Sequence, residues 1–222
     1  MAWNKVMPAH PVVAVAGATG VVGREMLKVL AQRDFPAAKV KALASARSAG
    51  STVEFGDGEL VVEEMTPASF EGVDIALFAC GGDTSKEYRQ AVVDAGCVMI
   101  DNSSAFRVDD DVPLVVPEIN GADAFENKGI IANPNCSTII TLMAVAGLAK
   151  LSPIKAMVAS TYQAVSGAGQ AGFSELQGQM EAIVAGKPTE HSTFPTQICL
   201  NVIPHIGDEL ENGYTDEEMK MQ

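Results

Sequence analysis

Near its start the chain joins a short apolar run to a glycine-rich loop, and this combination limits the possible folds more than any other feature. Residues 11–16 read PVVAVA, which predicts a buried parallel strand. Residues 17–23 read GATGVVG, and residues 24–30 continue with the apolar spacing of a helix. Strand, loop and helix together predict the first part of a dinucleotide-binding βαβ unit, whose loop lets a pyrophosphate approach the helix N-terminus.

The spacing of the loop is G-x-x-G-x-x-G rather than G-x-G-x-x-G, so its position between a strand and a helix decides for cofactor binding over a plain turn. A second expected strand, residues 39–44, is followed by Ser45, Arg47 and Ser48. An NAD-specific unit usually carries an acid here for the ribose hydroxyl, and none is present. Arg47 and Ser48 suit a 2′-phosphate, which favours NADP. The alternative is that Arg47 is an exposed loop cation.

Up to residue 132 the chain keeps a strand–helix rhythm, which predicts an α/β fold with a doubly wound parallel sheet. We expect a hairpin within 51–72 and a helix ending near residue 95. The further strands expected are 73–80, 98–101, 114–118 and 129–132. Cys80 and Cys97 fall in or beside these strands and are expected in the core.

The turn Gly81-Gly82 and the segment DNSSAFR, residues 101–107, each follow a strand, at the edge where such sheets bind ligands. Arg107 could hold a phosphate or a carboxylate through its bidentate fork. The alternative is an ion pair between Arg107 and the acids at 109–111.

The sequence NPNCST, residues 133–138, introduces a cysteine just before a long apolar run. Pro134 keeps the preceding residue out of the helical region, and Asn135 is a preferred N-cap residue. Cys136 is therefore expected in the first turn of a helix, where free backbone N–H groups favour a thiolate nucleophile. The alternative is a buried, inert cysteine.

After residue 150 the pattern changes, and we expect a second α+β domain over residues 135–222, following a dinucleotide-binding domain over 1–134. Strands are expected at 154–165 and 197–202, a helix at about 170–184, and a helix capped by Thr215 or Asp216 near the end. Because that helix has barely begun at Gln222, the sequence looks truncated. His191 and His205 are expected in loops or at the surface.

Composition excludes several classes of protein. Of the 222 residues, 47% are hydrophobic and 19% charged, as in an ordinary globular protein. The formal net charge of −13 argues against nucleic-acid binding. Four widely spaced cysteines without a C-x-x-C pair argue against a disulfide framework or a metal site. The absence of a signal peptide, or of any run near the ~20 apolar residues of a membrane span, predicts a cytoplasmic location.

Seven segments, spread over about residues 11–221, together resemble the bacterial aspartate-β-semialdehyde dehydrogenases. They are VAVAGATGVVG, SARSAG, DNSSAFR, PLVVPEIN, GIIANPNCSTI, STYQAVSGAG and NGYTDEEMK. The pair NPNCST and YQAVSGAG is the most specific. Relatives with the same two-domain plan, such as the N-acetyl-glutamyl-phosphate reductases and glyceraldehyde-3-phosphate dehydrogenases, differ in these stretches.

The resemblance implies a role for individual residues. Cys136 would be the acyl-thioester nucleophile and Gln163 would orient the substrate. Arg107 and Lys220 would hold the phosphate, and Glu217 would meet the substrate amino group. The NADP contacts it implies are the loop residues Gly17, Thr19, Gly20, Val21, Val22 and Gly23, the 2′-phosphate ligands Arg47 and Ser48, and the nicotinamide neighbours Ser166 and Gly167.

The implied reaction is the reversible, NADP-dependent reductive dephosphorylation of L-aspartyl-4-phosphate to L-aspartate 4-semialdehyde, in lysine, methionine and threonine biosynthesis. The general acid/base histidine and the substrate-carboxylate arginine of the family would follow Gln222, so we expect little activity from these residues alone. The full-length protein is expected to be a homodimer. The alternatives are a non-catalytic NADP-binding or dimerisation module, and a related acyl-phosphate or acyl-CoA reductase such as a malonyl-CoA reductase.

Overall fold

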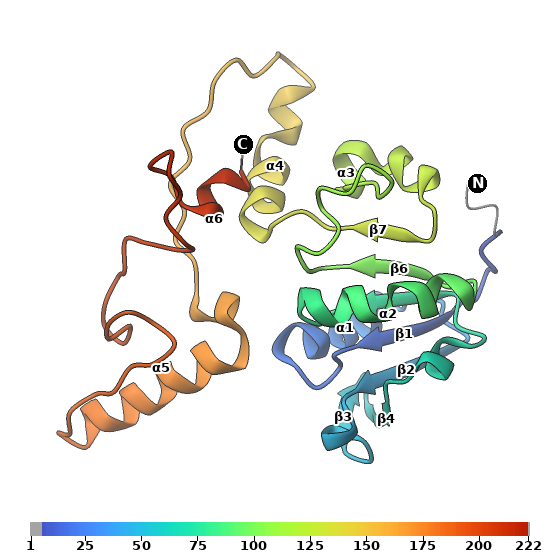
Figure 1. Cartoon of the computed structure of the whole chain (residues 1–222), viewed down its shortest axis with the longest axis horizontal. Helices are drawn as coiled ribbons and strands as arrows, with labels where there is room; N and C mark the ends of the chain where they lie inside the picture. The colour runs from blue at the N-terminus through green and yellow to red at the C-terminus, as the bar shows by residue number, and fades with distance from the viewer. Residues whose placement is uncertain (1–5, 222) are drawn as a thin grey trace. The chain divides into compact units, whose positions relative to one another are not determined.

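A computed structural model describes residues 6–221, and the chain divides into two compact units (Figure 1). The first, here the sheet unit, extends to Ile154; the second, the helix–loop unit, begins at Lys155. The domain boundary predicted between residues 134 and 135 stays a prediction.

The sheet unit is built on a seven-stranded sheet with the order β3-β4-β2-β1-β5-β6-β7. All neighbouring strands are parallel except β3, which pairs with β4 in an antiparallel hairpin. From β1 the chain builds outward on one side, then returns to add β5, β6 and β7 on the other, which confirms the doubly wound sheet. The strands are β1 (Val12–Ala16), β2 (Lys39–Ala44), β3 (Thr52–Phe55), β4 (Gly58–Glu64), β5 (Ile75–Phe78), β6 (Val98–Asp101) and β7 (Ile130–Ala132).

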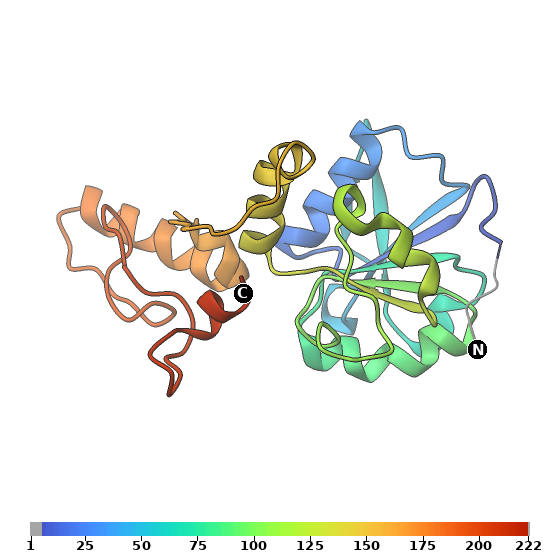
Figure 2. The ribbon, with the colours of Figure 1, turned by 90° about the horizontal axis from the view of Figure 1, so that it is seen from above.

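Helices cover both faces of this sheet, since successive side chains of a strand point to opposite faces. Val15 of β1 packs in one buried cluster with Leu27 of α1 (Val21–Gln32). Its neighbours Ala14 and Ala16 pack in the other cluster with Val92 of α2 (Gly82–Asp94). In Figure 2 the blue helix α1 and the green helix α2 accordingly lie on either side of the strands. The continuous apolar strands in the sequence are therefore buried on both faces.

The segment at 114–118, predicted as a strand, is only partly one. Leu114 forms an isolated parallel bridge with Ala132, and the Val115 N–H donates to the Ala132 carbonyl over 2.9 Å. The chain then turns into the short helix α3 (Pro117–Asn120). Pro117 explains the change, because proline cannot donate to a strand ladder and its fixed φ suits the first position of a helix.

The sheet unit ends with α4 (Cys136–Ala149), and the helix–loop unit contains α5 (Gly169–Val184) and α6 (Asp216–Met219). Thr215 caps α6: its hydroxyl accepts the Glu218 N–H, and the Glu218 carboxylate accepts the Thr215 N–H. The helices predicted at 170–184 and after Thr215 are confirmed. Among residues 6–221, no helix is both long and apolar enough to cross a bilayer.

The strands predicted at 154–165 and 197–202 are wrong. Within 155–221 the structure has no strand, only an isolated bridge between Glu209 and Thr215. The alternating apolar residues of the first segment, such as Val158 and Tyr162, are exposed, and no neighbouring strand in this unit offers a ladder. In the second segment, the N–H groups of Ile198 and Cys199 donate to the side chain of Gln179 instead.

Candidate functional site

The loop after β1 requires glycine at two positions. Gly17 has φ +80°, and a Cβ there would lie 2.9 Å from the Ala79 carbonyl oxygen. A Cβ on Gly23 would lie 2.1 Å from the Gly17 carbonyl oxygen, inside van der Waals contact. The loop therefore folds tightly against the start of α1. A side chain at Gly17 or Gly23 would occupy the space into which the neighbouring backbone packs.

The first turn of α1 offers unshared backbone N–H groups. Gly20 is the N-cap residue and has no side chain with which to satisfy them, while Val21 and Val22 are the first helical residues. Thr19 contributes its carbonyl oxygen, which accepts from Arg24 Nε over 3.1 Å. This helix start stands at the carboxyl end of β1, beside β5, where the direction of chain building reverses. The geometry fits the pyrophosphate of a dinucleotide.

Arg47 and Ser48 lie in a short 3-10 turn (Ala46–Ser48) directly after β2, the neighbour of β1 in the sheet. The Arg47 side chain is exposed and Ser48 is half-buried. The turn is closed by the Ser48 N–H, which donates to the Ser45 carbonyl over 2.8 Å. The structure thus places a cation and hydroxyls at the same sheet edge as the glycine loop. An exposed Arg47 also fits the alternative of a loop cation, so its ligand stays a prediction.

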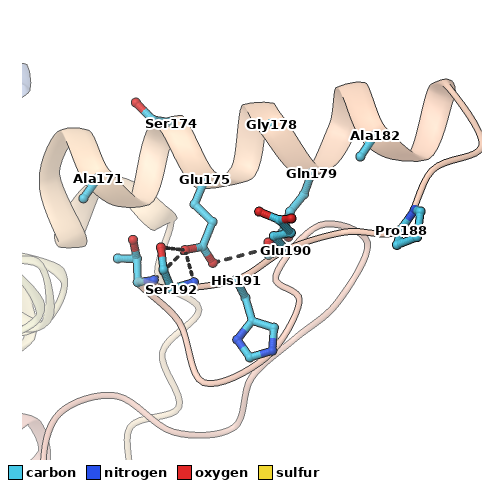
Figure 3. Close-up of a pocket in the computed structure, with 11 residues that line it drawn as sticks. Ala171, Ser174, Glu175, Gly178, Gln179, Ala182, Pro188, Glu190, His191 and Ser192 are labelled. Atoms are coloured by element: carbon cyan, nitrogen blue, oxygen red, sulfur yellow. Dashed lines mark hydrogen bonds between the residues drawn. The ribbon is translucent and has the colours of Figure 1, made fainter.

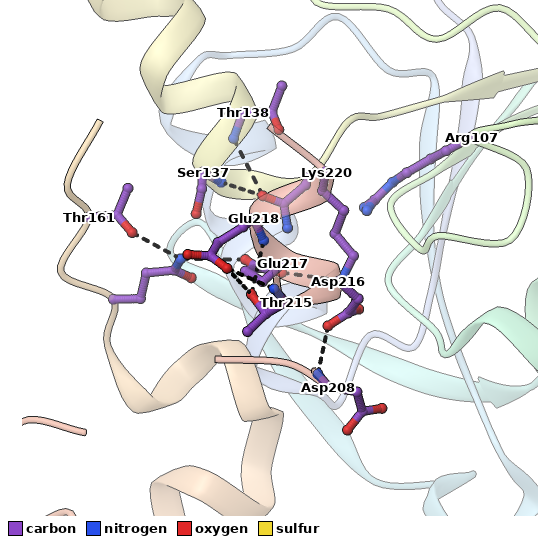
Figure 4. A network of polar contacts seen from close by, with 12 residues as sticks. Arg107, Ser137, Thr138, Thr161, Asp208, Thr215, Asp216, Glu217, Glu218 and Lys220 are labelled. Atoms are coloured by element: carbon purple, nitrogen blue, oxygen red, sulfur yellow. Dashed lines mark hydrogen bonds and ion pairs between the residues drawn. The ribbon is translucent and has the colours of Figure 1, made fainter. Parts of the chain in front are cut away.

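Cys136 is the first residue of α4 and is exposed. Asn135 is the N-cap residue, and its side-chain oxygen accepts the N–H groups of Ser137 at 2.9 Å and Thr138 at 3.4 Å, drawn as dashed lines in Figure 4. The placement predicted from NPNCST is confirmed, and the buried alternative does not hold. Because α4 follows β7, the sulfur stands at the carboxyl edge of the sheet. It belongs to the first turn of the helix, which is the positive end of the helix dipole.

Cys80 lies in a different environment. It is half-buried, and Cys97 is fully buried, so the predicted core position is confirmed for Cys97 and only partly for Cys80. Burial, assisted by the negative charge of Asp101, raises the pKa of the Cys80 thiol to about 11. At neutral pH this thiol stays protonated, which is unsuitable for a nucleophile.

Asp101, the last residue of β6, is a polar centre whose role was not expected from the sequence. Its carboxylate is fully buried and accepts the hydroxyls of Ser85 and Ser103, each over 2.6 Å. Its carbonyl oxygen accepts the Asn133 N–H over 2.8 Å. The signal in the sequence was an acid ending an otherwise apolar strand, since such a group needs partners when buried.

Arg107 connects the loop after β6 with the turn that leads to Cys136. Its Nε donates to the Asn133 carbonyl over 2.8 Å, and its Nη2 donates to the Asn102 carbonyl over 3.1 Å. The acids considered as its partners, Asp109 and Asp111, form ion pairs with Arg89 at 3.0 and 3.3 Å. The guanidinium of Arg107 is thus fixed by backbone oxygens at the site edge.

In the helix–loop unit, three residues that the family resemblance assigned to the substrate come together. Gln163 Nε2 donates to Glu217 Oε1 over 3.4 Å, and Lys220 Nζ lies 3.2 Å from Glu217 Oε2 and 2.7 Å from Asp216 Oδ2 (Figure 4). Burial alone would lower the pKa of Lys220, but its bonds to Asp216 and Glu217 raise it. The bond from Lys220 is also the main cause that lowers the pKa of Asp216. The ammonium therefore stays charged.

Ser166 and Gly167 lie in a 3-10 turn (Val165–Ala168) that leads directly into α5. Both are exposed. That they lie against the nicotinamide end of a bound cofactor stays a prediction.

A groove runs between α5 and the loop at 188–193 (Figure 3). The Glu175 carboxylate crosses it and accepts the N–H groups of Ser192, at 2.8 Å, and Thr193. Partial burial acts to raise the pKa of Glu175, but these backbone bonds prevail and lower it to about 2. His191 and His205 are exposed loop residues, as predicted. The polar groups of this groove hold the loop to the helix.

Within residues 6–221, no cluster of three or more His, Cys, Asp or Glu side chains is arranged to hold a metal ion.

Comparison with known proteins gives consistent matches along the chain. Residues 12–127 match the family described as semialdehyde dehydrogenase, NAD binding domain, and residues 145–222 match semialdehyde dehydrogenase, dimerisation domain. Aspartate-semialdehyde dehydrogenase of Bacillus subtilis is 49% identical over 94% of this chain and 62% of its own length. That of Aquifex aeolicus is 50% identical over 94% and 63%.

A solved structure of aspartate semialdehyde dehydrogenase II from Vibrio cholerae, complexed with ASA, superposes with a TM-score of 0.90 at 45% identity. The match covers 96% of this chain and 64% of that one. The chain therefore spans somewhat less than two thirds of the length of the relatives it matches.

Proposed function

The chain belongs to the semialdehyde dehydrogenase family, and from this we propose that it carries the NADP-binding and nucleophile-bearing part of an aspartate-semialdehyde dehydrogenase. The reaction is the reversible reductive dephosphorylation of L-aspartyl-4-phosphate to L-aspartate 4-semialdehyde, a step in lysine, methionine and threonine biosynthesis. The observation that supports it most is Cys136, exposed as the first residue of an N-capped helix at the carboxyl edge of the sheet.

Cys136 acts as the nucleophile in this proposal. The sulfur lone pair forms a bond with the acyl carbon of the aspartyl phosphate, the bond from that carbon to the phosphate oxygen breaks, and inorganic phosphate leaves. The product is a thioester on Cys136. Covalent capture divides one difficult reduction into two easier steps. The exposed sulfur stands in the first turn of α4, and the Asn135 side chain caps that helix start.

The glycine loop and its neighbours would hold the cofactor. NADPH, when bound, supplies the hydride that reduces the thioester. The N–H groups of Val21 and Val22 would bind the pyrophosphate, with Gly17, Thr19, Gly20 and Gly23 shaping the loop. Arg47 and Ser48 would bind the 2′-phosphate, and the choice of NADP over NAD rests on them. Ser166 and Gly167 are assigned to the nicotinamide end from the family resemblance alone.

The substrate carries an amino group and a phosphate, and the residues assigned to it have the complementary charges. Glu217 would accept the amino group, and Gln163, which already contacts Glu217, would orient the acyl chain. Lys220 and Arg107 would bind the phosphate and stabilise its charge as it departs. The complex of the Vibrio cholerae relative with ASA supports the same substrate class for this chain.

A second copy of the chain is the partner proposed for the helix–loop unit. Residues 145–222 match a dimerisation domain. α5 exposes large apolar side chains at helical spacing, Phe173 at 50%, Met180 at 53% and Val184 at 89%. Exposed apolar area of this kind is typical of an interface.

The test uses the half-reaction that Cys136 must perform. The 222-residue chain is mixed with L-aspartyl-4-phosphate, and intact mass and released phosphate are measured. We expect an aspartyl adduct on Cys136 with matching phosphate release, none with Cys136→Ser, and an unchanged adduct with the control Cys80→Ser. Turnover with NADP is expected to be little or none, because neither His191 nor His205 lies in the family's general acid/base motif.

The same test separates the alternatives. NADP binding without any adduct would favour a non-catalytic NADP-binding or dimerisation module. An adduct from another acyl phosphate, or from malonyl-CoA, in preference to aspartyl phosphate would favour a related reductase.

A further inference from the structure

Helix α2 presents two residues to the segment that runs from Asp101 to Val112, which carries Arg107. Ser85 and Arg89 are four residues apart and so lie on the same face of the helix. Ser85 is fully buried, and its hydroxyl donates to Asp101 Oδ1 over 2.6 Å. One end of the segment is thereby fixed to α2 where it leaves the sheet.

Arg89 fixes the middle and the far end of the same segment. Its Nη1 lies 3.0 Å from Asp109 Oδ2 and its Nη2 lies 3.3 Å from Asp111 Oδ2. Its Cζ stands 5.2 Å from the ring centroid of Phe106, a side chain that is only 1% exposed. Arg89 therefore contacts the segment on both sides of Arg107, immediately before it and two and four residues after it.

These contacts have a geometric consequence for Arg107. Arg107 reaches from this segment to the carbonyls of Asn102 and Asn133, and Asn133 stands three residues before Cys136. A single partly exposed ion pair adds little to stability, because water and salt screen it. A planar guanidinium that spans two carboxylates and stacks on a buried ring fixes orientation as well, which a lysine cannot reproduce.

We propose that Arg89 is a positioning residue: it holds the 101–112 segment so that Arg107 keeps its bonds to the carbonyls of Asn102 and of Asn133, which lies three residues before Cys136. The importance of this for the reaction rests on the proposed function, in which Arg107 binds phosphate and Cys136 attacks. The placement of Arg107 itself does not rest on it, so the two are tested by different measurements.

The direct test follows the Nε–H of Arg107 by NMR. In the wild-type chain this proton is bonded to the Asn133 carbonyl and should exchange slowly with water; Arg107→Lys assigns the signal. Arg89→Gln is expected to speed its exchange by at least about tenfold, the loss expected for a bond worth about 1.4 kcal/mol. Arg89→Lys, which keeps charge but not the fork, should give an intermediate rate.

The matched control is Lys86→Gln, which removes one positive charge from an exposed position on the same helix. It should leave the exchange of the Arg107 Nε–H unchanged. An exchange rate in Arg89→Gln within twofold of wild type, or a change as large in Lys86→Gln, would overturn the proposal.

A second measurement connects positioning with reactivity. Arg89→Gln is expected to slow the alkylation of Cys136 by iodoacetamide at least threefold while the NADPH dissociation constant stays within twofold of wild type. Equal changes in both would mean general destabilisation and would contradict a positioning role. A wild-type chain that neither binds NADPH nor alkylates at Cys136 would contradict the proposed function, while the Arg107 exchange still decides the proposal.

Discussion

The two units differ in how their apolar side chains are packed. In the sheet unit, strand residues such as Phe78 and Met99 are fully buried between strands and helices. In the helix–loop unit, Phe173, Met180 and Val184 are exposed. Among the described residues of that unit, Cys199 is the one hydrophobic residue that is buried. An apolar pattern therefore forms a strand or a core only where this chain also provides the surface that covers it.

The units also hold their candidate site residues by different means. In the sheet unit, Arg107 and Asn135 are fixed through backbone carbonyl and amide groups next to the sheet. In the helix–loop unit, side-chain contacts join Gln163 to Glu217 and Glu217 to Lys220. Bonds to a rigid backbone resist salt, whereas partly exposed ion pairs are screened.

The largest difference between the units is expected in the free energy of unfolding that is lost when an aromatic side chain is truncated to alanine. Phe78→Ala empties a fully buried site and should reduce the free energy of unfolding of the sheet unit by about 3–5 kcal/mol. Phe173→Ala, at a half-exposed site on α5, should cost less than about 1 kcal/mol. Urea titration followed by circular dichroism measures both. Equal costs would show that α5 is as well covered as the sheet.

The glycine loop should tolerate no side chain. Gly23→Ala places a Cβ against the Gly17 carbonyl, so the loop must move and NADPH affinity should fall by at least about 100-fold, or ~2.8 kcal/mol. Gly147→Ala is the matched control, since open space surrounds that helical position. It should leave affinity unchanged and stabilise α4 by about 0.5–1 kcal/mol. Isothermal titration gives both affinities, and a tight-binding Gly23→Ala chain would refute this account of the loop.

Cofactor choice should depend on the turn after β2. Arg47→Gln is expected to weaken NADPH about tenfold, because one cation facing the 2′-phosphate is lost, and to leave NADH binding as it was. Fluorescence titration of the reduced nucleotides measures the ratio. If both nucleotides weaken equally, or neither does, Arg47 is the exposed loop cation of the alternative.

The smallest effect concerns the loop at 188–193. Glu175 has a folded-state pKa of about 2, below its ordinary value of 4.5, so its carboxylate stabilises the folded unit above pH 4.5. That stabilisation is lost as the pH falls toward 2. The melting temperature of wild type should therefore exceed that of Glu175→Gln at neutral pH, and the difference should shrink below pH 4.5. A difference that is independent of pH would contradict the assignment.

Much of the sheet unit could be predicted from the sequence, because its signals are local. Glycines at 17 and 23, the apolar strands, and Asn135 ahead of Cys136 each determine backbone geometry within a few residues. The contacts of Asp101 and Arg107 could not be predicted in this way. Their partners, Ser85 and Asn133, are brought close only by the order of strands in the sheet.

The helix–loop unit shows the opposite case. Its helices were predictable from periodicity and from the capping box at Thr215. The strands expected at 154–165 and 197–202 were wrong because alternation indicates a strand only when a neighbour completes the ladder. At 197–202, the N–H groups of Ile198 and Cys199 donate to the side-chain oxygen of Gln179 and not to a neighbouring strand. Gln179 is about 20 residues away in the sequence, so no local pattern reveals this bond.

The rate at which iodoacetamide alkylates Cys136 at neutral pH is the best test of the proposal that this residue is an activated nucleophile. Peptide mapping gives the rate at each of the four cysteines, with glutathione as an unstructured reference thiol. We expect Cys136 to react at least about fivefold faster than glutathione, and Cys80, Cys97 and Cys199 to react far more slowly. A Cys136 that reacts no faster than glutathione, or more slowly than Cys80, would contradict it.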